Sequence, residues 1–298
     1  MITRDEISMQ ETMEFRIPEE NAREYLDPSV GVSLGSIHKT VRKVEVATGD
    51  PLFARICEID REFQKRSNGK HFFFLGWIPH RRYTKRELND AEALQLLIMR
   101  VFEPAGEECG TVYDESTTCD ICGSGAIQRS DLVLDSRSLP KGGKLAIAST
   151  IAGEIVVSST FVKMFETHEL RGAEFRPIWL LGNTLAVCPE WLQLYDTSHS
   201  LKVVHPTLAG IRPTDDDADG RFRCPLGHTI GLNLISELWI SREDYENSQC
   251  DIAFTKQRVG VRRGLLRPES SLLISPRLWR VLQDSHLRGY RVEVAHLK

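Results

Sequence analysis

The sequence predicts a mixed α+β protein, with an N-terminal αβ cap followed by two tandem, related αβ units. Three observations lead to this class. A C-x2-C pair lies near the middle of the chain, a C-x3-H pair follows about a hundred residues later, and two segments of similar sequence recur at constant spacing. These features divide the chain into three regions, which we place at residues 1–105, 106–204 and 205–298.

The composition is that of a globular protein. Of the 298 residues, 41% are hydrophobic and 27% are charged, which supplies enough apolar mass for one large core or two modest ones. The net charge of the chain is -4. Proteins that bind nucleic acids or membrane surfaces usually carry an excess of basic residues, so this charge argues against both classes. The N-terminus is charged from its fourth residue, no apolar run could cross a bilayer, and the seven cysteines are odd in number. We therefore expect a cytoplasmic protein in a reducing compartment, without a membrane partner.

The first region contains strand and helix patterns. Residues 13–17 alternate as a strand does, and residues 72–77 have the composition of a buried strand. Thr84 and Glu87 have the spacing of a capping box, in which each side chain hydrogen-bonds the backbone N–H of the other residue. Apolar residues then recur at helical spacing as far as Val101. We therefore expect the clearest helix of this region to start after Thr84 and to include these apolar positions.

The second and third regions resemble each other over a stretch that includes a Leu-Arg-Gly motif. The match has no gap, and its register is constant at 117 residues. Each copy predicts a strand, a helix with serine at its N-cap, a glycine turn and a second strand. Chance similarity is the alternative, and the gapless match favours a tandem duplication. The segments that match at this spacing are 155–175 and 272–292; upstream, outside the constant register, 147–150 resembles 252–255.

Two pairs of metal-ligand residues precede these segments. A C-x2-C pair on a turn is half of a tetrahedral zinc site, and Cys119 and Cys122, followed by a glycine, form such a pair. Cys224 and His228 supply the other half. Four protein ligands leave zinc no open coordination position, so we predict one structural Zn²⁺ per chain, bridging the two related units, and no catalytic metal.

This prediction has alternatives. The cysteines could be free thiols without a metal, or another cysteine could replace a ligand of the second pair. A thioredoxin-type redox pair is disfavoured, because no short βαβ unit surrounds Cys119. The candidate substitutes for a ligand are Cys109, Cys188 and Cys250.

Two further motifs imitate functional sites. Residues 31–35 match G-x-S-x-G, but a proline three residues earlier and the lack of a buried strand argue against a nucleophile elbow. Residues 215–220 imitate the start of a calcium loop, but Leu226 occupies the position that requires a bidentate glutamate. We expect a solvated acidic loop there, and we predict no catalytic residue.

An enzyme and a nucleic-acid-binding protein are the competing functional hypotheses. An enzyme would use an acidic cleft near Asp114 and Glu115, where neighbouring carboxylates could divide acid and base roles. A nucleic-acid-binding zinc-knuckle protein would use the basic segments 80–86 and 258–267. The acidic net charge argues against nucleic acid as a partner, and solvated arginines around a helix start and a hairpin are the simpler explanation.

The cysteine pairs and the repeated segments together resemble a known family. Cys119-x2-Cys122-Gly123, a degenerate second knuckle at Cys224 and the repeated Leu-Arg-Gly segment are similar to the double-CXXCG motif proteins described from myxobacteria. The chain departs from that pattern where Gly227-His228 replaces Cys-Gly.

The segment 158–175 also resembles a stretch near the C-terminus of bacterial polymorphic-toxin immunity proteins. The likeness covers about residues 113–178 and 223–297, and it leaves out the first hundred residues. It implies a bacterial, cytosolic, non-enzymatic binding protein that neutralises a cognate toxin. The expected partner is therefore a protein, either a toxin or the product of a neighbouring gene.

Overall fold

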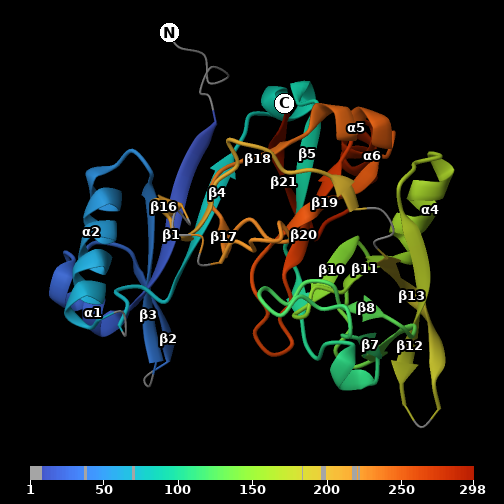
Figure 1. The fold of residues 1–298 in the computed structure, drawn as a ribbon, viewed down its shortest axis with the longest axis horizontal. Coiled ribbons are helices and arrows are strands. Elements are labelled where there is room, and N and C mark those ends of the chain that lie inside the picture. Colours follow the sequence, from blue (N-terminus) through green and yellow to red (C-terminus); the bar gives the residue numbers. More distant parts are fainter. Residues whose placement is uncertain are drawn as a thin grey trace. The chain divides into compact units, whose positions relative to one another are not determined.

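The computed structural model describes residues 9–36, 39–68, 71–182, 184–195, 199–216, 220 and 222–298 (Figure 1). It is a mixed α+β protein with several sheets, which confirms the predicted fold class. The chain forms two compact units, one of Met1–Glu87 with Arg212–Asp216, and one of Leu88–Ile211 with Asp217–Lys298. The first unit therefore ends before residue 105, and both related αβ segments lie in the second. None of the helices in the described ranges has the length and apolar character needed to span a membrane.

The first unit is a four-stranded antiparallel sheet with two helices on one face (Figure 1). The strand order is β2-β3-β1-β4. Alternate residues of β1, Met13, Phe15 and Ile17, are buried against the helices, which confirms the strand expected there. The elements are β1 Gln10–Pro18, α1 Glu19–Tyr25, β2 Val32–Ser36, β3 Lys39–Ala47, α2 Pro51–Arg66 and β4 Gly76–Arg82.

The buried strand expected at residues 72–77 is mostly an irregular segment, since β4 begins only at Gly76. Phe73 and Phe74 are buried in the core, as their composition indicates. Side chains satisfy the Phe73 backbone in place of a neighbouring strand: its N–H donates to Asp60 at 2.9 Å, and its carbonyl oxygen accepts from Asn21 at 3.0 Å. Apolar composition alone does not reveal such side-chain partners.

The helix expected after Thr84 is much shorter than its apolar pattern indicates. The capping box is present, because Thr84 N–H donates to Glu87 and Glu87 N–H donates to Thr84 Oγ1. The helix α3 nevertheless ends at Asp90, and the apolar run continues as the strand β5, Ala93–Ile98. Four successive residues at the start of β5 are buried, so this strand is covered on both faces and its pattern imitates a helix.

The second unit contains two six-stranded sheets. Their strand orders are β6-β10-β11-β13-β12-β9 and β14-β19-β20-β5-β21-β18. The first sheet is built from β6 Val101–Phe102, β9 Leu132–Asp135, β10 Ile147–Thr150, β11 Ile155–Ser158, β12 Glu174–Leu181 and β13 Ala186–Tyr195. The second is built from β5 and from β14 His199–Leu201, β18 Leu238–Ile240, β19 Ile252–Val259, β20 Glu269–Ile274 and β21 Tyr290–Leu297.

Helices and short elements connect these strands. Ser158 and Ser275 cap α4 and α6 by accepting hydrogen bonds from Phe161 N–H and Leu278 N–H, as the sequence predicts. The helices are α4 Ser159–Thr167, α5 Arg242–Ser248 and α6 Pro276–Ser285, with a 3₁₀ turn at Glu107–Cys109. The short strands are β7 Tyr113–Asp114, β8 Ile127–Gln128, β15 Ala209–Arg212, β16 Asp215–Asp216 and β17 Asn233–Leu234. Residues 217–219 of the expected acidic loop lie outside the described residues.

The two six-stranded sheets have the same strand directions position by position. Each has a parallel pair at both edges and antiparallel pairs between them. The register also agrees, because Ile178 lies opposite Leu132 in one sheet, and Ala295, 117 residues later, lies opposite Leu238 in the other. The two sheets therefore repeat one arrangement.

The fourth strand of each sheet comes from an unexpected part of the chain. In the first sheet it is β13, which follows the other five strands in sequence. In the second it is β5, which precedes them and lies, in teal, among orange and red strands (Figure 1). Gln193 of β13 lies opposite Val156, and Gln95 of β5 lies opposite Leu273, 117 residues after Val156. If the second unit is divided into residues 93–181 and 186–297, each sheet is thus completed by a strand from the other half.

One hydrophobic core joins the two sheets and the helices α4 and α6. It includes Ile147 and Ile252 at equivalent places on β10 and β19. The glycines of the two Leu-Arg-Gly motifs lie at the same junction, Gly172 against Ile252 and Gly289 against Ile147. The helix residues in this core are Phe161, Val162 and Phe165 of α4 and Leu278 and Leu282 of α6.

Candidate metal centre

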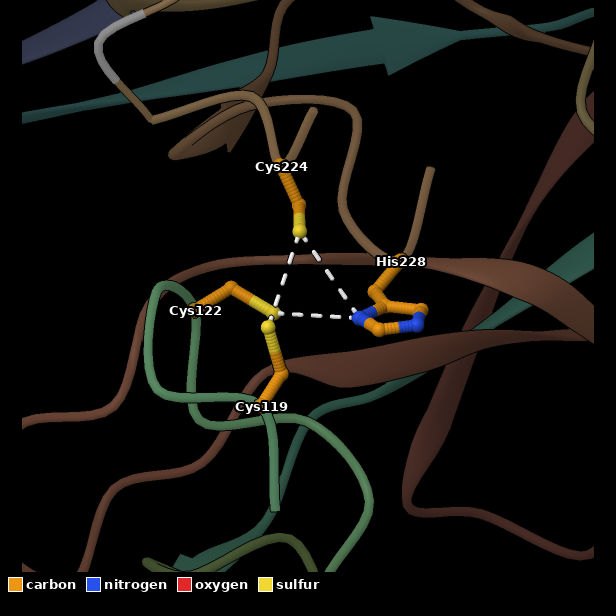
Figure 2. A group of neighbouring side chains, drawn as sticks. All are labelled: Cys119, Cys122, Cys224 and His228. Carbon is orange, nitrogen blue, oxygen red and sulfur yellow. Dashed lines mark hydrogen bonds between the residues drawn. The ribbon is translucent and has the colours of Figure 1, made fainter. Parts of the chain in front are cut away.

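Four metal-ligand side chains converge in the second unit. The Sγ atoms of Cys119, Cys122 and Cys224 and a ring nitrogen of His228 lie within 4.8 Å of one another. Figure 2 shows them on two separate loops, pointing toward a common centre. The Sγ atoms of Cys119 and Cys224 are 3.8 Å apart, and His228 Nδ1 lies 3.8 Å from Cys122 Sγ and 3.7 Å from Cys224 Sγ.

These distances fit a tetrahedral zinc site. A tetrahedron with Zn–S bonds of about 2.3 Å has S–S edges of about 3.8 Å, and a shorter Zn–N bond gives slightly shorter S–N edges. The donor set of three thiolates and one imidazole also belongs to the class that zinc prefers. The residues predicted from the sequence are therefore close enough to hold a metal ion.

The first ligand loop lies between β7 and β8 and has the backbone geometry of a metal knuckle. Gly123 N–H donates to the Cys119 carbonyl oxygen at 2.8 Å, and Cys119 N–H donates to the Ser124 carbonyl oxygen at 2.8 Å. The backbone N–H groups of Cys122 and Ile121 point at Cys119 Sγ and lower the pKa of this thiol to about 6. The loop therefore favours the thiolate, which is the form that binds metal.

The second ligand loop closes in the same way. Cys224 N–H donates to the carbonyl oxygen of Thr229, five residues later, just as Cys119 does to Ser124. Gly227 N–H donates to the Cys224 carbonyl oxygen, and Gly227 has φ +78, a backbone conformation that favours glycine. His228 then presents Nδ1 to the two neighbouring thiols.

The hairpin formed by β19 and β20 connects the two ligand loops through backbone hydrogen bonds. Arg258 N–H donates to the His228 carbonyl oxygen at 2.8 Å, and Arg262 N–H donates to the Cys122 carbonyl oxygen at 3.1 Å. A Cβ atom at Gly123 would clash with the Arg262 side chain, so glycine is required where the hairpin meets the first loop. The sequence marks this segment only as basic, and nothing in its pattern reveals that it joins the two knuckles.

The four ligands differ in exposure. Cys122 and Cys224 are each 3% exposed, Cys119 is half-buried, and His228 is exposed. Burial raises the pKa of the Cys122 thiol. Solvent therefore reaches the centre on the side of Cys119 and His228.

The cysteines considered as substitute ligands lie elsewhere. Cys109 is buried, and burial raises the pKa of its thiol. Cys188 belongs to the core beneath the first six-stranded sheet, and the Cys250 thiol donates to the Ser248 carbonyl oxygen at 3.0 Å. None of the three joins the metal-ligand cluster found in the described part of the chain.

The acidic residues before the first knuckle are engaged in ion pairs and hydrogen bonds. Glu115 pairs with Arg262 at 2.6 Å, and Glu107 pairs with Arg267 at 2.6 Å. Asp114 accepts hydrogen bonds from the Ser116 hydroxyl and from Arg129, which hold the pKa of its carboxyl well below its usual range. These carboxylates therefore support the metal loop and its hairpin.

Tyr113 is a half-buried contributor that sequence reasoning missed. Its hydroxyl donates to Glu154 at 2.8 Å, and the Arg267 guanidinium lies 4.2 Å above its ring. Burial raises the pKa of this hydroxyl. The contact links the start of the first knuckle to the turn between β10 and β11, which no local pattern predicts.

The first basic segment and the G-x-S-x-G motif lie in the first unit. Ser33 is within the edge strand β2, and its hydroxyl donates to Glu19 at 2.8 Å, so it occupies no strand-to-helix turn. The basic side chains of β4 pair with acids of the same sheet: His80 with Glu14, Arg81 with Glu11 and Arg82 with Glu45.

No protein-family model matches this chain, and no curated protein matches it.

Proposed function

We propose that this chain is a non-catalytic binding protein with one structural zinc ion, held by Cys119, Cys122, Cys224 and His228. The observation that carries the proposal is that the four donor atoms lie within 4.8 Å of one another, and that three of the distances between them, at 3.7–3.8 Å, are close to the edges of a zinc tetrahedron. Four protein donors fill the coordination shell, so the ion has no position for an activated water. The carboxylates beside the first knuckle also support a non-catalytic role, because arginines already balance their charges.

We also propose that the second unit arose by tandem duplication. Three features support a common origin for residues 93–181 and 186–297. The two sheets have equivalent strand orders and registers, and the two knuckles close with matching hydrogen bonds. The zinc ion then takes two ligands from each half. Its role is to hold the knuckles together at the junction of the halves.

The proposed partner is a protein, namely a toxin or another product of a neighbouring gene, and the proposed compartment is the bacterial cytoplasm. The resemblance to double-CXXCG and immunity proteins supports this step. The ion pairs of the β4 arginines favour a protein over a nucleic acid, since these charges are already neutralised within their own sheet.

Two measurements test the proposal. Elemental analysis of protein purified without chelators should find about one zinc ion per chain. When this chain is co-expressed with the product of each adjacent gene in turn, one of these products should form a stable complex with it. That product alone should be toxic to cells that lack this chain. Protein without metal would remove the zinc centre, and failure to bind any neighbouring product would remove the immunity role.

A further inference from the structure

We infer that Cys119 and Cys224 form a reversible disulfide under peroxide, which replaces the zinc ion as the link between the two knuckles. This inference rests on the proposed zinc centre, because a zinc-bound thiolate is the group that reacts.

The distance between the two sulfur atoms permits the bond. Cys119 Sγ and Cys224 Sγ are 3.8 Å apart, so each must move by about 1 Å to reach the disulfide length of about 2 Å. Both residues lie on loops between strands, where such a shift disturbs no ladder of hydrogen bonds. Cys122 Sγ also lies within 4.8 Å of both sulfurs, so Cys122 is the competing partner that mapping of the disulfide must exclude.

Exposure selects the thiol that reacts first. Cys119 is half-buried, whereas Cys122 and Cys224 are each 3% exposed. Oxidation of cysteine follows thiolate character and access, and zinc coordination keeps all three sulfurs as thiolates. Peroxide therefore meets Cys119 before the other two ligands, and Cys224 is the sulfur placed to resolve the product.

The reaction balances with hydrogen peroxide as the oxidant. The Cys119 thiolate attacks one peroxide oxygen and breaks the O–O bond, which yields a sulfenic acid and hydroxide. The Cys224 thiolate then attacks the sulfenic sulfur, forms the S–S bond and releases a second hydroxide. Two protons from solvent convert these hydroxides to water, and the two electrons lost by the sulfurs reduce one peroxide. Zinc leaves, because two of its four donors are no longer thiolates.

The fold keeps the two thiols together after the ion has left. The strands β5 and β13 cross between the halves, and the backbone hydrogen bonds from the β19–β20 hairpin to both ligand loops use no metal-ligand side chain. Loss of zinc therefore does not separate the knuckles, so the disulfide forms within one chain and thiol reduction restores the site.

The test exposes the full-length, zinc-loaded protein to hydrogen peroxide. A chromogenic chelator reports zinc release, and mass spectrometry of an unreduced digest identifies the disulfide. We expect about one zinc released per peroxide consumed, a cross-linked peptide pair containing Cys119 and Cys224, and full recovery with dithiothreitol and added zinc. The matched control is Cys250→Ser, which removes another half-buried thiol outside the cluster and should change none of these results.

Three outcomes overturn the inference: a Cys119–Cys122 disulfide, cross-links between chains, or irreversible oxidation with no disulfide. A Cys224→Ser variant adds a second check, since its Cys119 should accumulate as a sulfenic acid that a dimedone probe traps. Measuring zinc binding and disulfide formation separately, with zinc-free protein included, distinguishes failure of this inference from failure of the proposed function. Zinc binding without the disulfide removes only the inference, whereas the disulfide in a protein that never binds zinc removes the metal role.

Discussion

Gly172 packs so closely on Ile252 that a Cβ atom at this glycine would overlap the carbonyl oxygen of Ile252. Gly289 has the same relationship with Ile147 in the other half of the unit, where the Cβ atom would lie 2.6 Å from the carbonyl oxygen. Both glycines also have positive φ, of +96 and +102. The Leu-Arg-Gly motif thus serves contact between the halves as well as the turn after each helix.

Gly172→Ala should therefore destabilise the protein by about 3 kcal/mol. The added Cβ atom is strained in the left-handed backbone conformation, and it clashes with the opposite half. Gly289→Ala should have an effect of the same order. Urea unfolding measures both. Gly143→Ala is the control, because nothing lies within 4 Å of its added Cβ, and a loss equal to that of Gly172→Ala would refute the packing argument.

Removal of one thiolate should release the metal. Cys119→Ser should lower bound zinc to a small fraction of the wild-type amount and lower the melting temperature by roughly 5 °C or more, because metal binding contributes to folding free energy. Elemental analysis and a thermal scan measure these quantities. Cys250→Ser should keep both at wild-type values, and a Cys119→Ser protein with full zinc content would show that Cys119 is not a ligand.

A cysteine in place of His228 should be able to act as the fourth ligand. His228 belongs to a loop that closes like the first knuckle, so His228→Cys should still bind the metal after a small shift of the loop. In the cobalt-substituted protein, the thiolate charge-transfer absorption should rise by about a third, since four thiolates replace three. His228→Ala should bind metal more weakly. Equal spectra for His228→Cys and wild type would mean that residue 228 does not coordinate.

The first unit should lose stability in acid through one buried ion pair. Glu19 accepts hydrogen bonds from Arg42 and Ser33, and these partners, Arg42 first, lower its pKa from 4.5 to about 2. Because the folded-state pKa is the lower one, this stabilisation is complete above pH 4.5 and disappears as the pH falls toward 2. The contribution at neutral pH is on the order of 1–3 kcal/mol.

Glu19→Gln should remove this part of the acid dependence and destabilise the unit at neutral pH, because it leaves Arg42 buried without its counter-charge. Urea unfolding at a series of pH values between 2 and 7 measures both effects. Glu20→Gln, at an exposed neighbouring position, is the matched control and should leave the profile unchanged. A Glu19→Gln profile that follows the wild type in acid would refute the role of this pair.

The candidate metal ligands could be predicted from local patterns, because each pair lies on its own short loop. The C-x2-C and C-x3-H spacings bring both donors of a loop to one side within a few residues. That Cys119 and Cys224 come within 3.8 Å of each other depends on the whole second unit, including the hairpin around Arg262. Side chains that only the fold brings together, such as Tyr113 and Glu154, left no signal in the sequence.

By itself, the sequence determined the fold class, the serine caps of α4 and α6, the capping box at Thr84 and the two half-sites. The caps, the capping box and the half-sites depend on residues within one turn or one loop of each other. Only the tertiary structure decided that residues 93–98 form a strand rather than a helix, and that β5 and β13 each complete the sheet of the other half. A strand buried on both faces has no period of its own, so its conformation is set by the partners that cover it.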